Sequence, residues 1–419
     1  MTSVETLILG AGISGLAYAS FSNEECLIVD KNKQVGGLCR TFYEKGYTWD
    51  FAGHFFHFSD EKNKKFFQKF IEQKELVSCN KNTKIFYENK YIDYPFQMNI
   101  HQLDKWEFID CLYDLFNRRI LNEYPDFEQM LYGKFGQSIT EKFLKPYNEK
   151  LYACDLQELD KNAMGRFFPY AEPEEIINNF KQKKNSSYNS IFIYPKKGAQ
   201  IFIDALIKSI SKSRFCLETE VIKINPYKKI VETSEGIIEY KKLINTIPLN
   251  HFVSMFPEKY IEKREKLNGN KVLVFNIGFD REPLDNKIHW IYYPQKDLNF
   301  YRVGFYNNIL GEKEMSIYVE IGYPLEKEIN INEQFNKTIT NLKKVGIIKQ
   351  HEIVAYNSLV INPGYAHITP ESIKYVNWLR KKLKKSNIYT IGRYGGWTYC
   401  SIEDCINEAR NLVIKNAKT

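Results

Sequence analysis

The stretch TLILGAGISG at residues 6–15 joins a short apolar run to three glycines with the spacing G-x-G-x-x-G. A run of small residues that we expect to be helical follows, and a second apolar run at residues 26–29 ends at Asp30. This succession of strand, glycine turn, helix and strand, with an acid 20 residues after the first glycine, is typical of a dinucleotide-binding fold.

The glycines and the acid predict how a dinucleotide would bind. Gly10 allows the tight turn, Gly12 lets backbone N–H groups approach a pyrophosphate, and Gly15 brings the helix close to the sheet. The helix N-terminus then directs its partial positive charge at the phosphates. Asp30 would accept hydrogen bonds from ribose hydroxyls, which argues against a 2′-phosphate at that position.

A second glycine loop follows in the sequence VGGLCR at residues 35–40. It resembles the second phosphate loop of FAD enzymes of the amine oxidase and sugar mutase superfamily, which favours FAD over NAD. Gly36 and Gly37 would give another close backbone approach, and Arg40 a charge for the pyrophosphate. The alternative is a plain surface turn that contains an arginine.

Composition limits the class of protein. A chain of 419 residues with 43% hydrophobic residues is long enough for two or three lobes around a large core. The net charge of +8 favours an anionic substrate. Its basic residues form only short runs, which are more typical of solvated helix faces than of nucleic-acid binding.

The eight cysteines show no CxxC and no zinc spacing, and no apolar run approaches the length of a membrane span. We therefore expect reduced thiols, no metal site, no nucleic-acid partner, no stable membrane insertion and a cytoplasmic location.

The pattern of elements predicts an α/β fold. We expect a Rossmann-like FAD-binding domain, an inserted helical lobe, and a mixed, largely antiparallel β-sheet domain for the substrate. The predicted parts are 1–80 for FAD, 81–182 for the mainly helical lobe with a mobile loop to 198, 199–250 for FAD again, 251–370 for the sheet, and 371–419 for C-terminal closure of the FAD site.

Two further stretches belong beside the cofactor in this arrangement. Gly53 and His54 follow a predicted strand, and strand ends in this fold face the cofactor crevice. The alternative for His54 is a structural histidine under an aromatic cluster. Near the C-terminus, GRYGGWTY at residues 392–399 leads into a helix that begins with the capping pattern of Ser401 and Asp404.

These features together identify a resemblance to the UDP-galactopyranose mutase family, closer to its eukaryotic-type branch, over nearly the whole chain. Besides the FAD fingerprint, the resemblance rests on Gly53-His54, YPFQMNI at 94–100, PYN at 146–148, the run 290–307, Tyr365, and GRYG at 392–395 with Tyr399.

The resemblance implies roles for single residues. The catalytic residues would be His54 and Arg302. The substrate would be bound by Gln97, Asn148, Tyr152, Lys197, Tyr292, Arg302, Tyr365 and Tyr399. The cofactor would be bound by Gly10, Gly12, Ile13, Ser14, Gly15, Asp30, Lys31, Gly37, Leu38, Arg40, Gly53, His54, Val221, Gly392, Arg393, Glu403 and Asp404.

The sequence departs from the family at three places. Tyr152 stands where tryptophan is usual, Lys197 where that branch has a lid arginine, and Glu403 where it tends to have asparagine. A lysine offers phosphate a point charge in place of a two-pronged contact. The sugar, and with it the nucleotide, is therefore left open.

The implied reaction is the ring contraction of UDP-galactopyranose, or a close relative, to the furanose used for galactofuranose in polysaccharide biosynthesis. The resemblance implies an isomerase in which N5 of reduced flavin forms an adduct with the sugar, without net redox, after activation by NAD(P)H or another reductant. The alternatives are an FAD-dependent oxidase related to amine and protoporphyrinogen oxidases, and a flavin-binding protein without catalysis. A homo-oligomer is left open.

Overall fold

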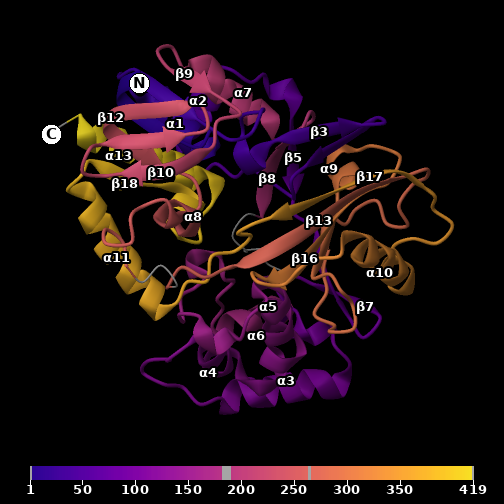
Figure 1. The fold of residues 1–419 in the computed structure, drawn as a ribbon. Helices are drawn as coiled ribbons and strands as arrows, with labels where there is room; N and C mark the ends of the chain where they lie inside the picture. The colour runs from indigo at the N-terminus through magenta and orange to yellow at the C-terminus, as the bar shows by residue number, and fades with distance from the viewer. Residues whose placement is uncertain (1, 182–189, 263–265, 418–419) are drawn as a thin grey trace.

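The computed structural model describes residues 2–181, 190–262 and 266–417 (Figure 1). Two seven-stranded sheets and a lobe of helices make up the molecule, and the helical lobe lies at the end remote from the first sheet. The predicted fold class, a Rossmann-like domain with an inserted helical lobe and a mixed sheet, is confirmed.

The first sheet contains the glycine fingerprint. Its strands are, in spatial order, β10 (Val221–Asn225), β11 (Ile230–Thr233), β12 (Gly236–Asn245), β1 (Thr2–Leu9), β2 (Cys26–Val29) and β9 (Arg214–Cys216), with β18 (Ile388–Thr390) also paired to β12. The strands β18, β12, β1, β2 and β9 run parallel, whereas β10 and β11 pair antiparallel.

Both faces of this sheet are covered, which explains the unbroken apolar run in β1. Leu7 and Leu9 pack into the core cluster on one face, while Ile8 packs into the cluster on the other, because successive side chains of a strand point to opposite faces. The covering helices are α8 (Leu249–Ser254) and α11 (Pro370–Lys384) on the first face, and α1 (Ile13–Phe21), α7 (Gln200–Ser209) and α13 (Ile402–Asn416) on the second.

The second sheet is mixed and largely antiparallel. Its strands are, in spatial order, β17 (Ile353–Ile361), β13 (Asn270–Phe279), β16 (Ser316–Pro324), β15 (Arg302–Phe305), β14 (Trp290–Tyr292), β6 (Thr83–Tyr87) and β7 (Lys90–Asp93). Only the β14–β6 pairing is parallel. The hairpin β6–β7 joins this sheet to the helical lobe, and α10 (Ile331–Lys344) packs against it.

The helical lobe lies below the second sheet in Figure 1. It consists of α3 (Lys105–Asn117), α4 (Phe127–Ile139), a π-helical segment (Thr140–Leu144), α5 (Lys145–Tyr152) and α6 (Pro173–Lys181). These helices share one buried cluster with the segment around Phe96. None of the helices in the described ranges is long and apolar enough to span a membrane.

Smaller elements connect these parts. They are the pair β3 (Thr41–Glu44) and β4 (Tyr47–Asp50), the pair β5 (Leu76–Asn80) and β8 (Ile191–Pro195), and the helices α2 (Glu61–Phe67), α9 (Tyr306–Leu310) and α12 (Gly392–Gly395). Part of the predicted mobile loop is thus a strand, because residues 191–195 pair antiparallel with β5. The rest of that prediction, residues 182–189, lies outside the described residues.

Lys150 on α5 connects the helical lobe to the second sheet through hydrogen bonds to backbone carbonyls. Its Nζ atom donates to the backbone carbonyls of Tyr293 at 2.9 Å and Gln295 at 2.7 Å, and also to that of Phe300. We expect Lys150→Met to lower the free energy of unfolding by about 2–4 kcal/mol, because buried carbonyls lose their donor. Urea denaturation measures this, with the exposed Lys296→Met as control. An unchanged midpoint would contradict the structural role.

Candidate functional site

The two glycine loops lie against each other at the ends of β1 and β2. Gly36 donates its backbone N–H to the carbonyl of Ala11 at 2.8 Å, and Gly12 and Gly36 form a β-bridge. Gly36 has a φ of 121°, a conformation that favours glycine. A Cβ built on Gly12 would meet only the Cα of Gly37, at 3.8 Å. An open backbone surface therefore remains where the sequence predicts a pyrophosphate.

Asp30 and Arg40 border this surface. Asp30 accepts the backbone N–H of Ala11 at 2.8 Å and that of Asn32 at 2.8 Å, so its carboxylate is held beside the first loop. Arg40 donates from Nε to the carbonyl of Gly37 at 2.8 Å. Burial lowers the pKa of Arg40, and the charge of Asp30 opposes that shift. The donors, glycines and carboxylate fit a dinucleotide such as FAD.

The C-terminal turn closes on the first glycine helix. Gly392 has a φ of 83°, and a Cβ there would lie 2.2 Å from the Oγ of Ser14. Its backbone N–H donates to Glu408 at 2.7 Å. Arg393 donates to the carbonyl of Cys400 at 2.9 Å. The prediction that residues 392–399 come to the dinucleotide loop therefore agrees with the contact between Gly392 and Ser14.

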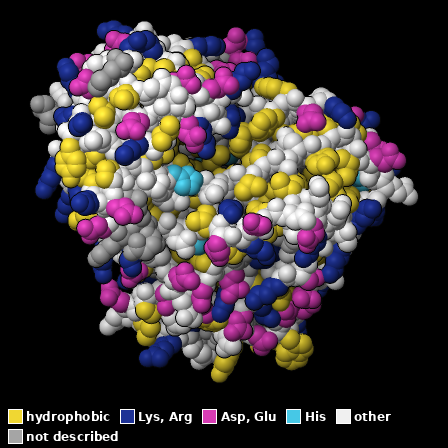
Figure 2. Space-filling view, viewed as in Figure 1, with side chains coloured by type: hydrophobic (Ala, Val, Ile, Leu, Met, Phe, Trp, Pro, Cys, Tyr) yellow, Lys and Arg dark blue, Asp and Glu magenta, His cyan; other side chains and the backbone are white. Residues whose placement is uncertain are grey.

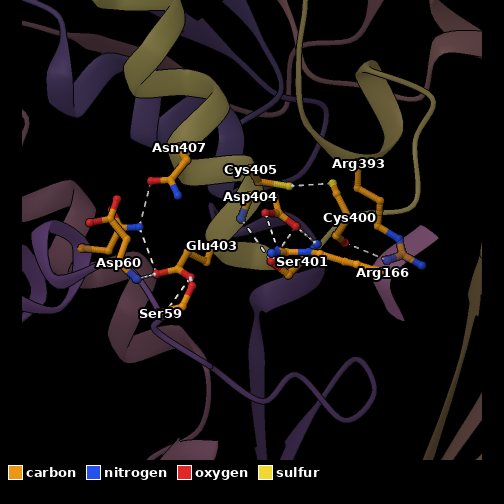
Figure 3. Close-up of polar contacts among 11 residues, drawn as sticks. Ser59, Asp60, Arg166, Arg393, Cys400, Ser401, Glu403, Asp404, Cys405 and Asn407 are labelled. Carbon is orange, nitrogen blue, oxygen red and sulfur yellow. Dashed lines mark hydrogen bonds and ion pairs between the residues drawn. The ribbon is translucent and has the colours of Figure 1, made fainter. Parts of the chain in front are cut away.

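Glu403 serves a structural contact (Figure 3). Its carboxylate accepts the N–H and hydroxyl of Ser59, the N–H of Asp60 and the side chain of Asn63. Burial alone would raise the pKa of Glu403, but these hydrogen bonds hold it below its ordinary value. A carboxylate with this many protein donors is engaged in fixing residues 59–63. The cofactor contact of Glu403 stays a prediction.

Asp404 is likewise engaged by protein groups. It completes the predicted capping box with Ser401, whose N–H and hydroxyl both donate to it, and it pairs with Arg166 at 2.6 Å (Figure 3). Its carboxylate thus caps α13 and connects that helix to the helical lobe, and its cofactor contact stays a prediction. Beside it, the Sγ atoms of Cys400 and Cys405 lie 3.7 Å apart; all eight cysteines are free thiols.

The other predicted cofactor residues lie in different surroundings, some exposed and some packed against the core. Lys31 is exposed after β2, and Leu38 is partly buried in the second glycine loop. Val221 begins β10 and packs partly against the core. Gly53 lies against Tyr318, since a Cβ there would be 2.5 Å from the tyrosine hydroxyl.

His54 follows β4 and lies near charged residues of the second sheet, Arg302 and Glu320. Its Nδ1 is 3.0 Å from the carbonyl of Ala52. A carbonyl only accepts, so Nδ1 carries the proton and Nε2 keeps a lone pair. Burial lowers the pKa of His54 to about 4, and the charges of Glu320, Arg393 and Arg302 act on the same ring. His54 is therefore neutral at neutral pH.

This neutrality predicts a pH dependence. The pKa of His54 in the folded protein, about 4, lies below the value of about 6.5 for an unfolded histidine. Between pH 7 and pH 5 the unfolded chain gains a proton at His54 that the folded chain does not. The free energy of unfolding therefore falls as the pH is lowered from 7 to 5. We expect a smaller fall for His54→Gln in urea denaturation. A His54 NMR signal titrating near pH 6.5 would contradict this.

Arg302 is held by a carboxylate that sequence reasoning missed. Arg302 on β15 donates from Nε to Glu320 on β16 at 2.8 Å and from Nη2 at 2.6 Å. The two residues are register partners of neighbouring strands. The Arg302 side chain is 21% exposed and that of Glu320 only 2%. A two-pronged pair fixes the plane of the guanidinium and leaves Nη1 for another acceptor.

Tyrosines and a second arginine surround this pair. The guanidinium of Arg393 lies 4.4 Å from the ring centre of Tyr399 and 5.4 Å from that of Tyr365. Tyr365 and Tyr399 stack with ring centres 6.0 Å apart. The charges of both arginines lower the pKa of Tyr365, although burial raises it more. Four predicted residues from three distant segments thus converge: Arg302, Arg393, Tyr365 and Tyr399.

Tyr292 belongs to the same set. Its hydroxyl accepts from the indole of Trp290 at 3.0 Å. Burial raises the pKa of Tyr292, and the charge of Arg302 opposes that shift. Its ring packs against Tyr94 and Tyr147 at 5.1 and 5.0 Å. These two tyrosines were not predicted, although both lie within stretches that carried the resemblance. Figure 2 shows hydrophobic side chains gathered across the middle of the molecule, between its lobes.

Three predicted substrate residues carry buried polar atoms without a protein partner among the described residues. Gln97 donates to the carbonyl of Pro169, but its Oε1 accepts nothing. Asn148 donates to Leu144 at 2.7 Å, but its Oδ1 is unpaired, as is the hydroxyl of Tyr152. Tyr152 lies 5.8 Å from the ring of Tyr365. Such atoms also occur elsewhere in the described residues, as at Tyr240 and Trp397, but a polar ligand beside these three residues would satisfy theirs.

Lys197 does not join this set. Its side chain is exposed in the turn after β8, and its backbone carbonyl accepts the hydroxyl of Tyr43 at 2.7 Å. The following Gly198 packs against Asp50, which is fully buried and accepts hydrogen bonds from Thr41 and Tyr194. Burial raises the pKa of Asp50 to about 6. The contact between Gly198 and the buried Asp50 therefore holds this turn in place. Among the described residues, none of the other predicted substrate-binding residues is recorded in contact with the amine of Lys197.

Comparisons with known proteins agree with the fold. Residues 8–70 match the model of the NAD(P)-binding Rossmann-like domain. The inactive all-trans-retinol 13,14-reductase of Danio rerio is 37% identical over 51 residues, 12% of this chain and 8% of that protein. The protoporphyrinogen oxidase of Dictyostelium discoideum is 27% identical over 154 residues, 34% of this chain and 27% of that protein. These matches span less than a third of either relative.

Solved structures match over the whole chain. A reduced UDP-galactopyranose mutase superposes with a TM-score of 0.91 at 21% identity, covering 100% of this chain and 94% of that one. A putative protoporphyrinogen oxidase from Exiguobacterium gives 0.77 at 16% identity, with 99% of each chain covered. Sequence identities this low show a shared fold.

Proposed function

We propose that this chain is a flavin-dependent mutase that contracts the pyranose ring of a nucleotide-diphospho-sugar, UDP-galactopyranose or a close relative, to the furanose without net redox. The observation that carries the proposal is the convergence of Arg302 and Arg393 with Tyr292, Tyr365 and Tyr399 from distant segments. Paired guanidinium and phenol donors suit a diphosphate, which must be held while it leaves the anomeric carbon and returns.

The charge of this site is modest. Glu320 offsets Arg302, so that pair contributes oriented N–H donors more than net charge, and Arg393 supplies the remaining positive charge. Such an arrangement holds a departing diphosphate without binding it too tightly for its return. The unpaired atoms of Gln97, Asn148 and Tyr152 would face the nucleoside.

FAD is the cofactor we propose, held at its pyrophosphate by the backbone of Gly12, Ile13 and Ser14 and at its ribose by Asp30. When bound, reduced FAD would supply the nucleophile for exchange at the anomeric carbon. His54, neutral and with Nε2 free of a proton, can accept a hydrogen bond from a sugar hydroxyl or the cofactor.

An FAD-dependent oxidase is the second candidate, because the Dictyostelium relative is a protoporphyrinogen oxidase. A pocket for a hydrophobic substrate such as a porphyrinogen would be lined by apolar side chains. The arginines and polar tyrosines listed above instead suit a charged substrate.

A substrate screen distinguishes the two. Dithionite-reduced protein would be offered UDP-galactose and its N-acetyl and deoxy relatives, with furanose formation followed by chromatography. A furanosyl product that disappears when the flavin is reoxidised would support the mutase and name its sugar. Silence across UDP-, GDP- and dTDP-sugars, with oxygen uptake on an amine or a porphyrinogen, would support the oxidase.

A further inference from the structure

Cys400 and Cys405 form a pair of thiols at the start of α13. Their Sγ atoms lie 3.7 Å apart, and Figure 3 shows the two side chains facing each other, one from the turn before the helix and one from the helix itself. Ser401 caps the helix, so the cysteines occupy the position before the cap and the fourth position of the helix. Side chains at these two positions often pack together as an apolar contact. The geometry of the helix start therefore brings two thiols into contact.

The two thiols have different surroundings. Cys405 is 4% exposed, whereas Cys400 is partly buried and lines a cavity of about 440 Å³ together with Trp397. Among the described residues that line this cavity, none belongs to either glycine loop, so bound FAD would leave the approach to Cys400 open. A hydrogen bond with Cys400 lowers the pKa of Cys405, and burial opposes that shift. The helix N-terminus acts in the same direction as the hydrogen bond, so Cys405 is the thiol that ionises first.

The backbone of Cys400 holds a side chain of the proposed diphosphate site. Its carbonyl accepts a hydrogen bond from Nη1 of Arg393 at 2.9 Å, and the ring centre of the preceding Tyr399 lies 4.4 Å from the same guanidinium. Cys405 is fixed within the helix, because its backbone N–H donates to the carbonyl of Ser401 at 3.1 Å. If the gap between the two sulfurs shortens, Cys400 therefore moves more than Cys405, and the anchor of Arg393 moves with it.

We propose that Cys400 and Cys405 are a redox switch, in which a reversible disulfide between them displaces the Arg393 guanidinium and weakens the binding of a nucleoside diphosphate. The effect on binding rests on the proposed function, whereas formation of the disulfide does not. A disulfide bond is about 2.05 Å long, so the two sulfurs must approach each other by about 1.7 Å from their present separation. In a reducing compartment such bonds are transient and sense oxidants.

Hydrogen peroxide supplies the oxidising equivalents. The Cys405 thiolate attacks one peroxide oxygen, the O–O bond breaks, and the products are a sulfenic acid and a hydroxide that takes up the thiol proton as water. Cys400 then attacks the sulfenic sulfur, which forms the S–S bond and releases the second water. Two thiols thus lose two electrons and two protons, and one peroxide becomes two waters. A reduced flavin that reacts with oxygen is a source of peroxide, and an added dithiol reverses the bond by exchange.

Thiol counting and peptide mapping of the full, FAD-loaded chain test the disulfide. The FAD is kept in its oxidised form, so that the flavin does not consume the peroxide. We expect one equivalent of peroxide to remove two of the eight free thiols, to lower the mass by two hydrogens, and to place the bond between Cys400 and Cys405. Dithiothreitol should restore all eight thiols. Cys400→Ser should form no disulfide, whereas Cys154→Ser, which alters a partly buried thiol in the helical lobe, should form it as the parent does.

Titration with UDP, followed by calorimetry, tests the effect on binding. The peroxide-treated parent should bind UDP several-fold more weakly than the reduced parent and should recover with dithiothreitol. Cys405→Ser lacks the thiol that peroxide attacks, so it should bind UDP alike before and after treatment, with a thermal midpoint that shows it is folded.

Three results would overturn the switch. They are a bond from Cys405 to a different cysteine, oxidation that ends at a sulfenic or sulfinic acid, and a disulfide form that binds UDP as tightly as the reduced form. A reduced parent that does not bind UDP would instead remove the proposed function and the effect on binding with it, while the disulfide, which is counted separately, would stand.

Discussion

Replacing Arg302 with alanine is expected to lower kcat/KM by about a thousandfold while FAD stays bound. Arg302 is the guanidinium that Glu320 holds in one plane next to Tyr292. Loss of one oriented donor at a site of developing charge costs about 10²- to 10³-fold in rate. Turnover by the dithionite-reduced variant, together with its flavin absorbance, measures both parts of this prediction.

The controls separate chemistry from folding. Arg302→Ala leaves Glu320 buried without its partner, which destabilises a protein by about 3–5 kcal/mol, so the thermal midpoint must be measured alongside activity. Arg302→Lys keeps a positive charge near Glu320 but loses the planar guanidinium. Its activity should lie between that of the parent and that of Arg302→Ala. Arg281 also pairs with a carboxylate but is 47% exposed, so Arg281→Ala should have no effect. Near-normal turnover by folded, flavin-loaded Arg302→Ala would remove Arg302 from the site.

Local structural features that depend on residues close together in the chain could be predicted from the sequence. The glycine turn and the capping box of Ser401 and Asp404 were both predicted and are present. Each depends on a few adjacent backbone and side-chain groups, so the local pattern is sufficient.

Contacts between distant segments could not be predicted in the same way. Glu320 lies in a strand whose neighbours are almost all buried, and nothing in that run shows that it faces Arg302. Only the register between β15 and β16 brings the two together. For Glu403 the resemblance implied a cofactor contact, and nothing in the neighbouring sequence shows that its carboxylate also accepts hydrogen bonds from a distant segment. Its partners, residues 59–63, are some 340 positions away.

A single methyl group at Gly12 is expected to weaken FAD binding at least tenfold and leave the fold intact. Gly12 has a φ of −84°, which alanine adopts freely. A Cβ there would meet only the Cα of Gly37, at the ordinary contact distance of 3.8 Å. The methyl group would project over the backbone surface that we assign to the pyrophosphate. We therefore expect Gly12→Ala to weaken FAD binding at least tenfold with a nearly unchanged midpoint for apoprotein unfolding.

Gly15 supplies the matched contrast, because its added Cβ would lie 2.1 Å from the carbonyl oxygen of Gly10. No side chain can move to relieve that clash, so Gly15→Ala should damage the strand–helix packing itself and lower the apoprotein midpoint. Flavin fluorescence titration and thermal unfolding of the apoprotein together separate the two outcomes. If Gly12→Ala bound FAD as tightly as the parent, the pyrophosphate would have to lie elsewhere, and the assignment of this loop would fail. If both variants unfolded alike, the loss of FAD would report only a damaged fold.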